Sequence, residues 1–371
     1  MGTLFDYLDR YGETSFSQSP LNEVDSLIFS LISYVDPEEL VPAAYEADGI
    51  SLREAANAFF AKYPDPSKIY LGLILPYKFV LLLRAAKDTR RFGEVLVKGY
   101  RNVIDVAREM QFSAFTFVLP NDSALIAYRG TDDTLIGWKE DLNMAILPVI
   151  PAQEEAAAYL NAIAPRLPRD LYLTGHSKGA NLAAWAAFNC EPSVRAHLKQ
   201  VHSFDGPGFA TGTLRSPDYT AIRPIIQYFV PQGTVFGLLL EHDESYQVVH
   251  STQKGLHQHD GVSWQVEDTS LVRLETVTAG AKQINLAFHD WLSKTPREEC
   301  ERLIASLFRL LAVKQATTLT ETAKQVRKIF PFLRLFLTDR EARRTARKLL
   351  TLLLRLRRQG RRAERKAKFN S

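Results

Sequence analysis

The sequence of 371 residues has few cysteines and lacks the short motifs of cofactor-binding proteins. Only Cys190 and Cys300 occur, which excludes a framework of disulfides and favours a reducing compartment. No P-loop, dinucleotide-binding glycine pattern or metal-ligand spacing is present. We therefore expect neither a cofactor nor a bound metal.

Long apolar runs are also missing. The most apolar stretch, IYLGLILPYKFVLLL at 69–83, is short and is interrupted by Pro76 and Lys78, so it does not predict a membrane-spanning helix. The first residues, MGTLFDYLDRYGETSF, contain acidic side chains and no apolar region, unlike a secretory signal. Asp6 stands where a myristoylation site needs Ser or Thr. These absences predict a cytoplasmic protein.

The hydrophobic periodicity changes along the chain and divides it into three segments. Residues 1–110 carry apolar side chains at three- and four-residue spacing, which predicts a helical N-terminal segment packed on the core. Residues 111–297 alternate short strands with helices and predict an α/β core with a mostly parallel sheet between helices. Residues 298–371 predict a helical C-terminal extension.

The predicted elements of the α/β core follow one another closely. They are a hairpin at 113–130, helices at 152–167 and 178–189, and strands at 171–175, 200–206, 224–231, 246–251 and 262–267.

The stretch LYLTGHSKGANLAAWAA (171–187) places Ser177 between Gly175 and Gly179, where a predicted strand turns into a predicted helix. In a G-x-S-x-G turn the serine has strained backbone angles, and the glycines avoid collisions with the strand and the helix. The hydroxyl then lies at a helix N-terminus, which favours a developing negative charge. The pattern predicts a nucleophilic serine; the alternative is a turn whose glycines serve packing only.

Two stretches resemble the class 3 (fungal-type) lipases. TGHSKGANLA is similar to that family's nucleophile elbow, usually Gly-His-Ser-Leu-Gly-Gly-Ala. ALIAYRGTDDTLIGWKEDL (124–142) is similar to its strand ending in Phe-Arg-Gly-Thr, followed by a Trp and an Asp. The resemblance covers about 110–270. When the helical N-terminal segment is included, the chain most resembles an uncharacterised bacterial branch of this family. It implies an α/β-hydrolase fold, with Ser177 as nucleophile and the backbone N–H groups of Thr131 and Lys178 as the oxyanion hole.

A third stretch, HDGVSWQV (259–266), resembles the histidine-containing segment of the same lipases. The resemblance makes His259 the general base, with His250 and His257 as nearby alternatives. His176 precedes the nucleophile, and we expect it to point away from the reacting bond and to support the structure.

The acid of the triad is the part of the pattern that this sequence does not follow. Where the family has an Asp, FVPQGTVFG (229–237) has Gln232 and no carboxylate. A triad needs a carboxylate to fix the imidazole tautomer. Asp205, at the end of the strand after the nucleophile helix, is the first candidate, although an Asp before Gly-Pro can also serve only a turn. Asp243, in a loop with Glu241, is the second candidate.

The sequence therefore predicts a serine carboxylic ester hydrolase of lipase or esterase type, with an acyl-serine intermediate and an ester or lipid-like substrate. A thioesterase or peptidase is the alternative among enzymes, because a triad does not select the leaving group. A non-catalytic α/β-hydrolase scaffold that serves as a membrane or partner adaptor is the alternative outside enzymes.

The charge of the chain is distributed unevenly. Residues 339–371 contain 13 Lys and Arg against three Asp and Glu, whereas the preceding residues contain 33 against 39. The tail has the pattern of a basic amphipathic helix, which can lie on an anionic bilayer, dock on an acidic partner, contact nucleic acid non-specifically or pack on the acidic body. We favour the inner membrane surface, since a lipase-like enzyme would gain from residence there, and expect no specific nucleic acid partner.

Overall fold

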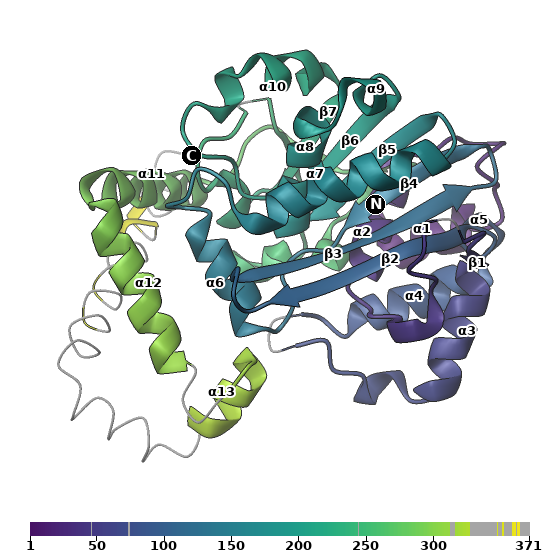
Figure 1. Ribbon diagram of the computed structural model, residues 1–371, viewed down its shortest axis with the longest axis horizontal. Helices are drawn as coiled ribbons and strands as arrows, with labels where there is room; N and C mark the ends of the chain where they lie inside the picture. Colours follow the sequence, from purple (N-terminus) through teal and green to yellow (C-terminus); the bar gives the residue numbers. More distant parts are fainter. Residues whose placement is uncertain are drawn as a thin grey trace.

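The structure is a computed structural model that describes residues 1–45, 47–72, 75–243, 245–311, 316–326, 347, 351, 358–360 and 362–363 (Figure 1). Within these residues, nine strands form one sheet in the order β1-β2-β3-β4-β5-β6-β7-β8-β11. Most of the basic tail, 339–371, lies outside the described residues. No described helix is both long and apolar enough to cross a membrane.

The sheet is parallel in its centre and antiparallel at both edges. Strands β4 to β8 pair in parallel, while β1, β2 and β3 at one edge and β11 at the other pair antiparallel. The strands are β1 Ile50–Ser51, β2 Leu96–Asp105, β3 Met110–Leu119, β4 Ser123–Tyr128, β5 Asp170–His176, β6 Leu198–Phe204, β7 Ile226–Pro231, β8 Gln247–Val249 and β11 Arg273–Leu274. A separate pair consists of β9 Val266–Glu267 and β10 Ser270–Leu271. The predicted α/β fold class is confirmed.

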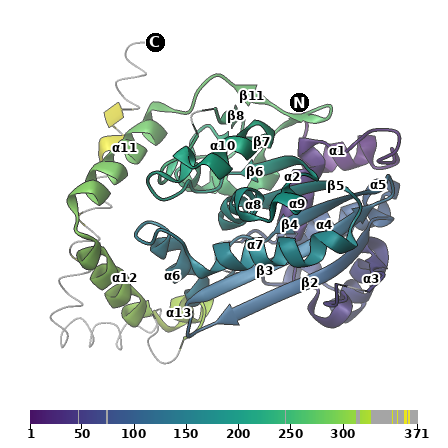
Figure 2. The same cartoon turned by 45° about the horizontal axis from the view of Figure 1, so that its top comes forward.

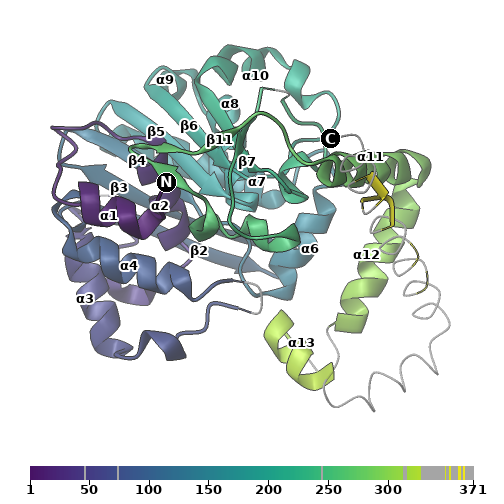
Figure 3. The same cartoon turned by 180° about the vertical axis from the view of Figure 1, so that it is seen from behind.

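Helices cover both faces of the sheet (Figures 2 and 3). One face packs on helices of the N-terminal segment and the other on α7 and α8. Strand β4 is buried throughout, and Leu125 and Ala127 join the first core whereas Ala124 and Ile126 join the second. This alternation follows from the two-residue period of a strand.

The helices follow the order of the chain. They are α1 Leu4–Tyr11, α2 Glu23–Ile32, α3 Leu52–Lys62, α4 Lys78–Asp88, α5 Arg90–Gly93, α6 Leu135–Asn143, α7 Pro151–Ile163, α8 Lys178–Asn189, α9 Pro192–Arg195, α10 Pro217–Ile222, α11 Ala279–Lys294, α12 Arg297–Leu311 and α13 Leu319–Val326. The last two extend away from the sheet (Figure 1), and the backbone N–H of Leu135 in α6 donates to Thr317, just before α13, at 2.8 Å.

Two segments differ from the elements that the sequence predicts. Strand β2 lies within the segment expected to be mainly helical, and it forms by pairing with β3 around a bulge at Gly99, where φ is 61°. The predicted strand at 262–267 is wrong except for Val266–Glu267. Instead, Asp260 caps a 3₁₀ turn by accepting the Val262 N–H at 3.0 Å, and buried Trp264 donates to the Gln258 carbonyl at 2.8 Å. The division at 110 and 297 stays a prediction.

A buried ion pair joins α2 to α5. Arg91 donates to Asp25 at 2.8 Å and 2.5 Å, and it also donates to backbone carbonyls of Thr14, Ser19 and Pro20. Both side chains are buried. The pair therefore anchors the irregular segment between α1 and α2 to the other helices of the N-terminal segment.

Arg91→Met should lower the free energy of unfolding by about 3–5 kcal/mol, because the Asp25 carboxylate would stay buried without its partner. Urea unfolding followed by circular dichroism measures this loss. The control is the double variant Asp25→Asn/Arg91→Met, which removes both charges and should lose less. A single variant as stable as the wild type would contradict the expectation.

Candidate active site

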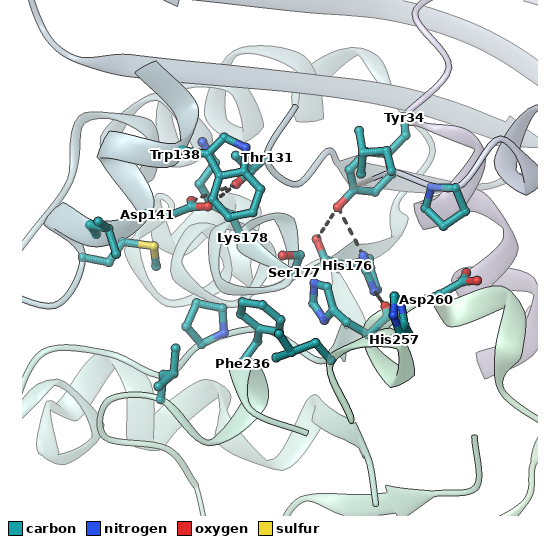
Figure 4. Close-up of a pocket in the computed structure, with 18 of the residues that line it drawn as sticks. Tyr34, Thr131, Trp138, Asp141, His176, Ser177, Lys178, Phe236, His257 and Asp260 are labelled. Carbon is teal, nitrogen blue, oxygen red and sulfur yellow. Dashed lines mark hydrogen bonds between the residues drawn. The ribbon is translucent and has the colours of Figure 1, made fainter. Parts of the chain in front are cut away.

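Ser177 lies at the corner between β5 and α8 and has backbone angles of φ 59° and ψ −132°. A Cβ added to Gly175 would lie 2.1 Å from the Gly179 carbonyl oxygen, and one added to Gly179 would lie 2.0 Å from that of Tyr128. Both glycines are therefore required by close backbone approach. The strained corner that the sequence predicts is present, and it directs the serine into a cavity (Figure 4).

His259, which lines the same cavity, is hydrogen-bonded to Asp205. Nδ1 of His259 lies 2.6 Å from Oδ2 of Asp205, the buried residue that follows β6. The other oxygen, Oδ1, accepts from the Thr234 hydroxyl and from the Gly237 N–H at 3.1 Å. Since Nδ1 donates to the carboxylate, Nε2 of the neutral imidazole is left as an acceptor. The structure thus brings the first acid candidate and the predicted base together.

Two rings and a backbone bond hold His259 in place. Its ring lies between Phe236 and His176, at centroid distances of 4.3 Å and 4.5 Å. Nε2 of His176 is 2.7 Å from the His259 carbonyl oxygen, which can only accept, so this nitrogen donates. The Tyr34 hydroxyl lies 3.2 Å from both Nδ1 and the backbone oxygen of His176, so its single proton is shared between these two acceptors (Figure 4). Burial, and secondarily the neighbouring His259, lower the pKa of His176 well below its ordinary value, which keeps it neutral.

The second acid candidate has other partners. Asp243 accepts from Arg223 at 2.8 Å and from the Tyr219 hydroxyl at 3.0 Å. Partial burial would raise its pKa, but hydrogen bonds from Arg223 and Ser245 outweigh it and lower the pKa to about 2. The neighbouring Glu241 accepts from the backbone N–H of Gly212.

Gln232, the residue at which the resemblance to the class 3 lipases led us to expect an acid, binds two backbone groups instead. Its amide donates to the Ser251 carbonyl at 2.9 Å and accepts the Ser251 N–H at 2.7 Å. The side chain thereby joins the end of β7 to the segment after β8. A carboxylate could not donate, so it could not make both bonds. Among the alternative bases, His250 pairs with Gln265 at 2.5 Å, and His257 lines the cavity.

Thr131 and Lys178, the two residues predicted to form the oxyanion hole, lie on the opposite side of Ser177 from His176 (Figure 4). The hydroxyl of Thr131 donates to both oxygens of Asp141, at 2.8 Å and 2.7 Å. Burial raises the pKa of Asp141 to about 6, against the lowering effect of Lys178. The ammonium of Lys178 is buried and lies 2.8 Å from Glu140.

Sequence reasoning missed the role of Glu140 as the partner of Lys178. One signal was available, because Lys178 is the only charged residue of KGANLAAWAAFN, a helix otherwise rich in small and apolar side chains. A lysine in such a buried helix requires an acidic partner. The sequence does not say which acid, since Glu140 is 38 positions away.

The cavity has a volume of about 440 Å³, which suits a small molecule. Ser177, His259 and Thr131 contribute polar groups to its wall. The rest is mainly apolar and includes Phe79, Trp138, Leu142, Phe236, Leu240 and Phe288. The wall can therefore accommodate an apolar group beside the serine.

Two solved structures similar to this chain are the crystal structure of M37 lipase and the native Rhizomucor miehei lipase propeptide complex. The first is 13% identical, covers 59% of this chain and 70% of that chain, and has a TM-score of 0.35. The second is 12% identical, covers 54% and 66%, and has a TM-score of 0.33. No curated protein matches. The Mbeg1-like family matches residues 86–309, more than half of the chain, so this protein belongs to the Mbeg1-like family, a lipase-like family.

Proposed function

We propose that this protein is a serine hydrolase of lipase or esterase type that cleaves carboxylic esters. The observation that carries the proposal is the 2.6 Å contact between His259 and Asp205 at a cavity that Ser177 also lines. A strained serine, an imidazole and a buried carboxylate are the groups that nucleophilic acyl transfer requires. We propose further that the protein belongs to a bacterial branch of the class 3 lipase-like proteins.

In the proposed acylation step, the Ser177 hydroxyl oxygen attacks the ester carbonyl carbon, and Nε2 of His259 takes the hydroxyl proton. Asp205 stabilises the resulting imidazolium through Nδ1–H. The carbonyl oxygen becomes negative, and the backbone N–H groups of Thr131 and Lys178 stabilise it. The C–O bond to the alcohol then breaks, and the alcohol leaves with the proton from His259.

Deacylation uses the same groups. A water gives a proton to His259 and attacks the acyl-serine carbonyl carbon. The same two N–H groups stabilise the second oxyanion, and Ser177 leaves with the proton. The apolar wall of the cavity, with Trp138 and Leu240, would hold the acyl chain.

A fluorophosphonate probe tests the proposal directly, because it reacts with an activated serine. We expect one covalent adduct at Ser177, located by peptide mass spectrometry. Absence of an adduct would favour the non-catalytic adaptor. Rates with a p-nitrophenyl ester, an acyl thioester and a peptide of matched size would separate an esterase from a thioesterase or a peptidase.

We also propose that the protein is cytoplasmic and that its basic tail contacts the anionic inner surface of the membrane. Deletion of 339–371 should weaken binding to vesicles with anionic lipid, since each basic residue near such a surface contributes about 1 kcal/mol. Turnover of a soluble ester should stay unchanged. Vesicle sedimentation measures the binding, and zwitterionic vesicles are the control. Equal binding with and without the tail would favour packing on the acidic body instead.

A further inference from the structure

Two consecutive carboxylates of α6 contact the two residues that we propose as oxyanion donors. Asp141 accepts the hydroxyl of Thr131 at 2.8 Å and 2.7 Å. Oε2 of Glu140 lies 2.8 Å from Nζ of Lys178. Thr131 follows β4 and Lys178 begins α8, so the two donors come from separate segments. Helix α6 is therefore attached to both segments through neighbouring side chains.

The Lys178–Glu140 pair is saturated with hydrogen bonds. Nζ of Lys178 also donates to the backbone oxygen and to Oε1 of Gln111, both at 2.7 Å, which uses its three donors. Glu140 accepts the backbone N–H groups of Gln111 at 3.1 Å and of Ala152 at 3.0 Å. Both side chains are buried. The pair therefore fixes the start of α8 relative to α6, β3 and α7.

Stability alone does not account for this pair. Apolar residues that replace a buried ion pair are often as stabilising or more so, because the charges need not leave water. Moreover, Nε2 of Gln111 is buried and has no hydrogen-bond partner among the described residues, which is a cost of the arrangement. The place of the pair, beside the proposed oxyanion hole, points to another role.

We propose that the Lys178–Glu140 pair positions the oxyanion hole, an inference that rests on the proposed hydrolase function. The pair holds the first turn of α8, and so the backbone N–H of Lys178, in a fixed place relative to that of Thr131. It also keeps the Glu140 charge neutralised near the point where the carbonyl oxygen becomes negative. Both side chains bind protein groups, so they act as positioning groups through the backbone donor.

A double variant separates positioning from stability. Lys178→Met or Glu140→Gln alone leaves one charge buried and unpaired, so each should lower both the Tm and kcat. Lys178→Met/Glu140→Gln removes both charges and should recover most of the Tm. Its kcat for a soluble p-nitrophenyl ester should stay about 10-fold or more below that of the wild type, with KM little changed, because the transition state alone uses the hole. Recovery of kcat together with the Tm would overturn the proposal.

The matched control is the double variant Asp25→Asn/Arg91→Met, which neutralises a buried pair that does not line the cavity. Its kcat should stay within about 2-fold of the wild type, since distant sites act independently. Fluorophosphonate labelling rates are measured on the same proteins. If the wild type and the Lys178→Met/Glu140→Gln variant are labelled equally fast, the positioning role is contradicted, whereas the proposed hydrolase function is not. A wild type without labelling would contradict the proposed hydrolase, and the positioning role with it.

Discussion

Ser177→Ala is expected to abolish fluorophosphonate labelling and to reduce ester turnover by about 10⁶-fold, to the level that binding and the oxyanion hole sustain alone. The substitution removes the oxygen atom that attacks the ester carbonyl carbon in the proposed acylation step, without which no acyl-serine forms. Alanine and serine both carry a Cβ, so the backbone angles of this corner are equally strained for either residue. The fold should therefore be unchanged. Turnover of a p-nitrophenyl ester and probe labelling measure the loss, and full activity in this variant would show that the nucleophile is elsewhere.

Ser177→Gly serves as the companion variant, because it tests whether the corner is strained. Glycine adopts φ 59°, ψ −132° without a Cβ penalty, although its unfolded chain is more flexible. We expect the same loss of activity as in Ser177→Ala. The free energy of unfolding of Ser177→Gly should be about 1 kcal/mol higher than that of Ser177→Ala. Urea unfolding of the two variants gives the difference. A glycine variant less stable than the alanine variant would contradict stored strain at this position.

The serine corner could be predicted from the sequence because the forces that form it are local. Gly175 and Gly179 are needed by contacts within the strand–turn–helix unit itself and with the adjacent end of β4. The position of Asp205 could be predicted for a related reason. Strands β5 and β6 are parallel neighbours, with His176 paired to Phe204, so the residues that follow them lie at the same edge of the sheet.

Other features depend on contacts that a one-dimensional pattern does not contain. The Glu140 partner of Lys178 lies on α6, two helices before α8 in the chain, and WKEDL offers two acids between which the sequence cannot choose. Likewise, VSWQV has the alternation of a strand, but the burial of Trp264 and the cap from Asp260 turn its first half into a 3₁₀ turn. In both cases tertiary packing overrides the local pattern.

Asp205→Asn is the variant that tests the acid. An asparagine carries no charge to stabilise the imidazolium, and its amide would donate to Nδ1 of His259, which places the proton on Nε2 and prevents that nitrogen from accepting from Ser177. We expect kcat to fall by about 10³–10⁴-fold with little change in KM, because substrate binding does not involve this buried side chain. Steady-state kinetics with a p-nitrophenyl ester measure both constants, and the Tm shows whether the bonds from Thr234 and Gly237 survive.

Asp243→Asn is the matched control for Asp205→Asn, since it makes the same chemical change at the other candidate acid. Asp243 is engaged by Arg223 and Tyr219, so its substitution should change kcat by less than about 2-fold and affect mainly stability. A large loss in Asp243→Asn with none in Asp205→Asn would move the acid to the 241–243 loop and require that loop to rearrange. Two variants with normal kcat would mean that His259 works without a carboxylate, which contradicts the triad. Only a loss confined to Asp205→Asn is compatible with a triad whose carboxylate is the residue that follows β6.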